Sequence, residues 1–380
     1  MTKGLYWRLS GFYLFYYATV GIFLPYWGLY LESLAFTPSD IGELLALLVV
    51  GKIIAPYLWG WIADHKGNRM GAIRLAGLLS VLVFTGALFA TSYFTLAIVM
   101  LVFGFFWSAS LPQFEAVTLN HLEGRVHDYT RVRLWGSIGF IITVIVLGEV
   151  LERYGVQYLP WIAFVMIVGI WLTSLIAPND VSDEDSFGHE PIVNVLKSPT
   201  VIAMLLAFFL MQVSHGAYYS FYTLYLEKYE YSRSVIGQLW ALGVIAEVGL
   251  FLVMLTMLKY FSLKMLLLTS LNCAAIRWFL IAYFPEYLSI IIFAQLLHAA
   301  TFGIHHAVAI QLIHRFFQGR HQGRGQALYS SLSFGAGGAL GALLSGYIWE
   351  GIGPAEVFLF AAATSLLGSF IVYKWMQNDV

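Results

Sequence analysis

The chain has 380 residues, of which 60% are hydrophobic and only 11% are charged, and its mean hydropathy is +0.77. A soluble protein carries about 25% charged residues, so this composition excludes an ordinary soluble protein and indicates a polytopic membrane protein. The net charge of −1 gives no sign of a nucleic-acid partner, and the single cysteine, Cys273, excludes a disulfide framework and a cysteine-based metal site.

Apolar runs long enough to cross a bilayer follow one another along the whole chain. A spanning helix needs about 20 apolar residues, and twelve runs meet this requirement, which predicts an all-α membrane protein with twelve transmembrane helices. The first run follows Lys3 and Arg8 and has no small-residue cleavage site, so we expect an uncleaved first helix. The predicted spans are 9–31, 41–62, 72–91, 94–117, 132–151, 157–177, 200–226, 234–257, 265–283, 288–312, 326–348 and 356–375.

The N-terminal and C-terminal halves of the chain resemble each other in sequence, which indicates an internal repeat. Leu29–Glu32 recurs as Leu224–Glu227, an offset of 195 residues that also holds through the next helix. The polar, acidic segment 178–199 lies midway and predicts a cytoplasmic linker between six-helix halves at 1–177 and 200–380. The first helix of each copy runs outward, so the repeat is parallel and the halves are pseudo-symmetric, with substrate expected between them near the midplane.

The basic residues predict that both termini lie in the cytoplasm. Membrane proteins carry an excess of Lys and Arg on cytoplasmic segments. With the N-terminus inside, fifteen of the 20 Lys and Arg fall on the cytoplasmic side, three fall outside, and Lys52 and Arg277 lie within helices. The fifteen are Lys3, Arg8, Lys66, Arg69, Arg74, Arg125, Arg131, Arg133, Lys197, Lys259, Lys264, Arg315, Arg320, Arg324 and Lys374, against Arg153, Lys228 and Arg233 outside.

Three charged residues lie well inside predicted spans. A charge at the bilayer centre costs roughly 2.5–3.5 kcal/mol on insertion scales and therefore needs a partner or water. The 195-residue offset maps Lys52 onto Glu247, so repeat-equivalent positions carry opposite charges that we expect to face a central cavity. Arg277 lies inside the ninth span, and the alternative to a functional role is a structural ion pair between Glu247 and Arg277.

Further polar groups are candidates for substrate or proton contact. Glu115 and Arg133 lie at similar depth on either side of a short loop and are expected to pair, unless Arg133 only marks a cytoplasmic helix end. Histidine changes charge near neutral pH, which suits proton coupling, although a neutral packing histidine is the alternative. The residues that share a helix face by spacing are Gln212 with His215 and, in the tenth span, His298, Thr301 and His305. Tyr219 and its mid-helix aromatic neighbours would suit a flat apolar solute or a sugar ring.

The stretch 60–69 resembles the loop between helices 2 and 3 of major facilitator superfamily transporters. Gly60, Asp64, Gly67 and Arg69 match that family's pattern, while His65 and Asn68 replace basic residues. The resemblance implies the major facilitator fold and a loop that latches one half of the transporter against the other.

Other residues resemble the lactose permease branch of that superfamily. The similar positions are Glu115, Arg133, Glu247, Arg277 and His298, which implies sugar or proton contacts there. Thr301, Gln295, Gln212 and His215 depart from the residues of that branch, so its proton relay is not carried over whole. The segments Tyr6–Ser10, Pro25–Leu31, Ser214–Tyr222 and His298–Gly303 resemble more closely the phenylpropionate permease family.

These features predict a bacterial inner-membrane transporter that works by alternating access without a cofactor or a metal. We expect a monomer that moves a small organic solute, an aromatic acid of phenylpropionate type, together with protons; an oligosaccharide or nucleoside proton symporter is the alternative. The short loops argue against a sensor with a soluble domain. The sequence also lacks a nucleophile–base or metal-binding set of residues, which argues against an intramembrane enzyme. We expect substrate contacts from Lys52, Glu115, Arg133, Gln212, His215 and Tyr219, and proton coupling through Glu247, Arg277 and His298.

Overall fold

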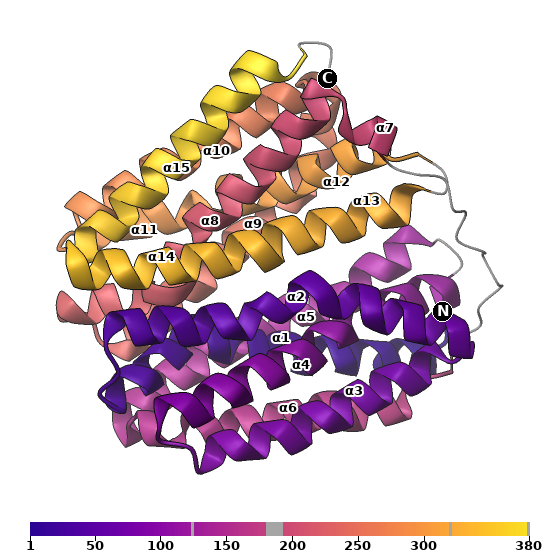
Figure 1. The fold of residues 1–380 in the computed structure, drawn as a ribbon, viewed down its shortest axis with the longest axis horizontal. Helices are drawn as coiled ribbons and strands as arrows, with labels where there is room; N and C mark the ends of the chain where they lie inside the picture. The colour runs from indigo at the N-terminus through magenta and orange to yellow at the C-terminus, as the bar shows by residue number, and fades with distance from the viewer. Residues whose placement is uncertain (123–124, 180–192, 319–320, 378–380) are drawn as a thin grey trace. The chain divides into compact units, whose positions relative to one another are not determined.

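The computed structural model describes residues 1–122, 125–179, 193–318 and 321–377, and within these ranges the regular structure is entirely helical. The described residues form twelve helical segments that are long and apolar enough to cross a membrane (Figure 1). Each coincides with one of the predicted apolar runs, so the predicted all-α membrane architecture is confirmed. Most helices extend beyond the apolar core, as α1 (Lys3–Ser33) does at both ends.

Two compact units make up the chain, Met1–Asp185 with Ser232–Gln238 and Ser186–Tyr231 with Leu239–Val380. Most of the predicted linker, residues 180–192, lies outside the described residues. The helices of the first unit are α1, α2 (Pro38–Lys66), α3 (Arg69–Phe84) with η1 (Thr85–Leu88), α4 (Tyr93–Leu122), α5 (Val126–Tyr154), and η2 (Val156–Tyr158) with α6 (Leu159–Ile176).

Two spans of the second unit are interrupted by π-helical turns, in which each backbone hydrogen bond joins residues five apart and not four apart as in an α-helix. The first π-helical segment, η3 (Ala299–Ile304), joins α11 (Leu288–Leu296) to α12 (His305–Phe316), and the second, η5 (Ser330–Gly337), joins α13 (Gln322–Tyr329) to α14 (Gly338–Gly351). The other helices are α7 (Val193–Leu196), α8 (Pro199–Lys228), α9 (Arg233–Tyr260), α10 (Leu263–Tyr283) and α15 (Pro354–Trp375). The beginning of α9, up to Gln238, is grouped with the first unit.

Several helix pairings recur inside each unit. In the first, α1 packs against α5 and α6, and α3 packs against α4 and α6. In the second, the equivalent helix α8 packs against α14, η5 and α15, and α10 packs against α12, η3 and α15. This repetition is what the 195-residue sequence repeat predicts for two pseudo-symmetric bundles.

Helices α2 and α4 touch backbone to backbone through two glycines. A Cβ atom built on Gly104 would lie 2.1 Å from the carbonyl oxygen of Leu48, and one on Gly51 would lie 2.7 Å from the backbone nitrogen of Phe105. Neither obstacle is a side chain that could rotate away, so a side chain at either position would force the helices apart. Small residues at helix crossings are the usual means of close approach within a bilayer.

We predict that Gly104→Ala lowers the free energy of unfolding of the first unit by about 1–3 kcal/mol, the usual cost of overpacking. Thermal unfolding of the detergent-purified protein measures this as a lower melting temperature. The matched control is Gly249→Ala, because Gly249 also lies inside a helix but a Cβ atom there meets nothing within 4 Å. An unchanged melting temperature for Gly104→Ala would contradict the backbone contact.

Candidate functional site

Arg277 of α10 is the centre of a polar cluster in the second unit. Its side chain is fully buried, and its guanidinium donates from Nη2 to Oε1 of Gln295 at 2.7 Å and from Nη1 to Oγ1 of Thr301 at 3.2 Å. Nη1 also lies 3.0 Å from Nδ1 of His298. A buried charge is stabilised when its hydrogen-bonding groups are matched. Here neutral side chains supply acceptors for Nη1 and Nη2, while the buried Nε has no partner among the described residues.

His298 lies between Arg277 and Glu247. A guanidinium only donates hydrogen bonds, so Nδ1 of His298 accepts and the proton of the neutral ring resides on Nε2. Nε2 in turn faces Oε2 of Glu247 at 3.6 Å. The structure thus brings together the three residues expected to couple protons, but in the order Glu247, His298, Arg277, and not as the direct Glu247–Arg277 ion pair of the structural alternative.

Exposure differs along this chain of groups. The side chain of Glu247 is 16% exposed, that of His298 is 7% exposed, and Arg277 is fully buried. Glu247 is therefore the most accessible of the three side chains. Protonation of His298 at Nδ1 would place an N–H group against the Arg277 N–H group and break their hydrogen bond.

Aromatic rings and Gln295 hold the guanidinium in place. The central carbon of the Arg277 guanidinium lies 4.2 Å from the ring centre of Tyr218 and 4.5 Å from that of Trp278, close enough for cation–π attraction. Nε2 of Gln295 donates to the hydroxyl of Tyr218 at 3.1 Å and to the carbonyl of Leu239 at 3.0 Å. Sequence reasoning missed the roles of Tyr218 and Gln295, although a polar Gln inside the tenth predicted span was the available signal.

His215 of α8 borders the same cluster. Its Nδ1 lies 2.9 Å from the carbonyl oxygen of Met211, and a carbonyl only accepts, so Nδ1 carries the proton and Nε2 is an acceptor. Nε2 is buried without a partner among the described residues. The ring packs edge-on against Trp278 with centroids 5.1 Å apart and lies 5.6 Å from the Tyr219 ring. Gln212, one turn earlier, is also buried.

The π-helical segment η3 corrects the predicted histidine face. Helical spacing predicts His305 on the face of His298, but the rings that continue in parallel from His298 are those of Phe302 and His306. Successive centroids are 5.6 and 5.9 Å apart, with interplanar angles of 9° and 5°. His305 instead packs against Phe208 of α8. The wider π turn advances the register by about one residue, which explains the error.

The first unit holds the predicted pair of Glu115 and Arg133. Nε of Arg133 lies 3.5 Å from Oε1 of Glu115, and both side chains are about one-third exposed, at 30% and 34%. The guanidinium also donates to the hydroxyl of Tyr17 and lies over the rings of Tyr17 and Tyr13, at 4.1 and 5.6 Å. Arg133 is therefore part of an aromatic and polar group and does more than mark a helix end.

The model of the MFS_1 like family matches residues 6–360. The chain belongs to this family. It is therefore a major facilitator transporter and not an enzyme, and its twelve spans together with the bacterial transporters that it resembles make it a multi-pass inner-membrane protein.

Individual relatives of this MFS_1-like chain have different substrates in their names. It is 29% identical over 371 residues to a probable 3-phenylpropionic acid transporter of Escherichia coli strain K12. This alignment covers 96% of both chains. It is 22% identical to a maltose permease of Geobacillus stearothermophilus, over 97% of this chain and 94% of the permease. A crystal structure of a mutant of the nucleoside transporter NupG superposes with a TM-score of 0.86 at 17% identity, covering 98% of this chain and 100% of that one, which shows a shared fold.

Lys52 of this MFS_1-like chain lies in α2 and is partly buried. It forms no hydrogen bond or ion pair with another residue of the described ranges. Lys52 and its repeat-equivalent Glu247 belong to different units, and only Glu247 has a described ionic neighbour, His298. The repeat therefore supplies equivalent positions but not equivalent surroundings.

The predicted latch residues lie where α2 ends and α3 begins. Gly67 has a φ of +57°, a left-handed conformation that glycine adopts without strain. Asn68 accepts a hydrogen bond from a backbone N–H one turn into α3 and so caps that helix, which gives this departure from the family pattern a structural role. Gly60 and Asp64 belong to α2 and Arg69 begins α3; the side chain of Asp64 is outside the described part of the structure.

Proposed function

We propose that this transporter moves an aromatic carboxylate of phenylpropionate type together with protons, by alternating access of two six-helix halves. The observation that carries proton coupling is the ordered series Glu247, His298, Arg277. Loss or gain of a proton at Glu247 or His298 changes a contact that His298, which lies between α11 and η3, makes with α9 or α10. Proton binding therefore alters helix packing.

Arg133 with its tyrosines is the proposed substrate anchor. A guanidinium binds a carboxylate through two parallel hydrogen bonds, and the rings of Tyr13 and Tyr17 offer faces for an aromatic group. Lys52 is the second candidate cation, and we propose Gln212, His215 and Tyr219 as the contacts from the second unit. The probable phenylpropionic acid transporter among the relatives supports this substrate class.

An oligosaccharide or nucleoside proton symporter is the second candidate. Glu115 beside Arg133 supports it, because a carboxylate and a guanidinium together offer acceptors and donors to hydroxyl groups. The maltose permease and a putative nucleoside transporter of Escherichia coli strain K12, also among the relatives, agree with it.

We further propose that the chain acts as a monomer with both termini in the cytoplasm. Gly60, Asp64, Gly67 and Arg69 then form a cytoplasmic latch. The excess of basic residues on that side supports the orientation.

Substrate-driven proton uptake tests the proposal. Protein in liposomes is mixed with 3-phenylpropionate, maltose or uridine, and the pH of a weakly buffered medium is recorded. We expect alkalinisation with 3-phenylpropionate alone. Alkalinisation with maltose or uridine instead would show that the substrate is a sugar or a nucleoside and not an aromatic acid. Accumulation of 3-phenylpropionate without proton movement would reject proton coupling.

A further inference from the structure

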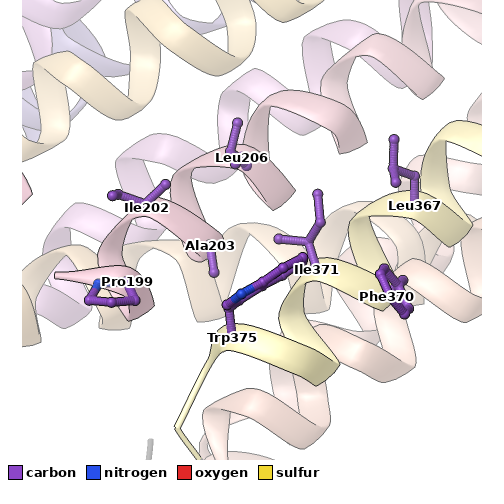
Figure 2. Close-up of a pocket in the computed structure, with 8 residues that line it drawn as sticks. All are labelled: Pro199, Ile202, Ala203, Leu206, Leu367, Phe370, Ile371 and Trp375. Carbon is purple, nitrogen blue, oxygen red and sulfur yellow. The ribbon is translucent and has the colours of Figure 1, made fainter. Parts of the chain in front are cut away.

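An apolar groove runs between the beginning of α8 and the end of α15 (Figure 2). It has a volume of about 450 Å³. The residues that line it are all apolar, and Figure 2 shows the Trp375 ring between the two helices, beside Ala203 and Ile371. Ala203 is buried at its floor, while its walls, including Ile202 and Phe370, are about half exposed, at 46% and 54%.

The length and position of the groove match one leaflet of a bilayer. From Pro199 to Leu206 and from Leu367 to Trp375 the two helices rise by about 10 and 12 Å, at 1.5 Å per residue. Half of the hydrocarbon core is about 15 Å thick. Pro199 and Trp375 are the terminal residues of their membrane spans, so the groove begins at the polar interface and continues into the hydrocarbon.

Two lysines lie at the interfacial end of this groove. Nζ of Lys374 lies 4.7 Å from the ring centre of Trp375 and 5.7 Å from that of Phe370, which both line the groove. Lys197 is exposed and precedes Pro199 by two residues. Neither lysine forms a hydrogen bond or ion pair with a described residue, so both ammonium groups are available to an anion at the membrane surface.

We propose that this groove is a binding site for an anionic phospholipid. One acyl chain occupies the apolar groove over Ala203, and the phosphate of the headgroup lies between Lys197 and Lys374. The combination of an apolar groove one leaflet deep and a basic mouth matches this amphipathic ligand. The acyl chain of a zwitterionic lipid can fill the groove equally well. Its headgroup binds the lysines more weakly, because its own ammonium group repels theirs. The site is independent of the substrate and of proton coupling.

Native mass spectrometry of the detergent-purified transporter tests the site. The protein is titrated with phosphatidylglycerol or phosphatidylethanolamine that carry the same acyl chains. Each lysine near an anionic surface contributes on the order of a fivefold gain in affinity, so we expect Lys197→Gln with Lys374→Gln to weaken phosphatidylglycerol binding by about 30-fold. Phosphatidylethanolamine binding should change little.

Two further variants make the test specific. Lys259→Gln removes an exposed lysine at the end of α9 and should leave phosphatidylglycerol binding unchanged. Ile202→Ser removes part of an apolar wall that is 46% exposed and should weaken both lipids, with an unchanged melting temperature as the check on folding. Equal affinity for the two lipids in the wild-type protein, or full retention of phosphatidylglycerol by the double lysine variant, would overturn the proposal.

Discussion

Glu247→Gln is expected to abolish substrate-driven proton uptake, reducing it to the background of protein-free liposomes. Glutamine keeps the size of the side chain but has no titrating proton, and it cannot present a negative charge to Nε2–H of His298, which faces Glu247 at 3.6 Å. The transporter would remain in the state equivalent to protonated Glu247. Exchange of substrate across the membrane, which needs no net proton movement, should continue, whereas accumulation against a gradient should stop.

The control for this prediction is Glu356→Gln, which removes a carboxylate from the first turn of α15 in the same unit. We expect it to behave as the wild-type protein. Normal proton uptake by Glu247→Gln would show that the Glu247, His298 and Arg277 cluster is structural. Loss of exchange as well as proton uptake would instead assign Glu247 a role in substrate binding or folding, which a melting curve distinguishes.

Arg133→Gln is expected to weaken the binding of 3-phenylpropionate by about 10- to 150-fold, the factor that corresponds to a charge-assisted hydrogen bond. The loss should be specific for the carboxylate. A binding assay should therefore compare the acid with its uncharged amide, 3-phenylpropionamide. The wild-type protein should prefer the acid, and Arg133→Gln should bind the two compounds with similar affinity.

Two other variants separate geometry from charge. Arg133→Lys keeps the positive charge but loses the two-pronged guanidinium, so we expect an intermediate affinity. Arg131→Gln removes a neighbouring arginine, which lies over Tyr6, and should leave the preference unchanged. If Lys52→Gln removes the preference for the acid and Arg133→Gln does not, Lys52 is the anchor. If neither does, the neutral-solute alternative gains support.

The membrane spans and the internal repeat could be predicted from sequence because the bilayer imposes both. Backbone groups in hydrocarbon must be paired within the segment, so a run of about 20 apolar residues has one stable form, the helix. The match of Leu29–Glu32 with Leu224–Glu227 then predicted two equivalent bundles, and α1 and α8 do make equivalent pairings in their own units. Neither inference needed a tertiary contact.

The sequence also indicated which polar residues are exceptional, but not how they are arranged. Arg277, Glu247 and His298 stand out because charged or titratable groups inside a span are costly. Their order in space, with His298 in the middle and Gln295 and Tyr218 completing the site, depends on how α8, α9 and α10 pack against the span of α11 and η3. Spacing along single helices does not contain that information.

What the sequence by itself determined is the class of protein, the course of its helices and the residues that deserve testing. What only the tertiary structure decided is the register and pairing of those residues. The π turn at Ala299–Ile304 put His306 in the place predicted for His305. Such a turn is stabilised by the neighbouring helices and not by a local composition signal, so a regular period of 3.6 residues could not reveal it.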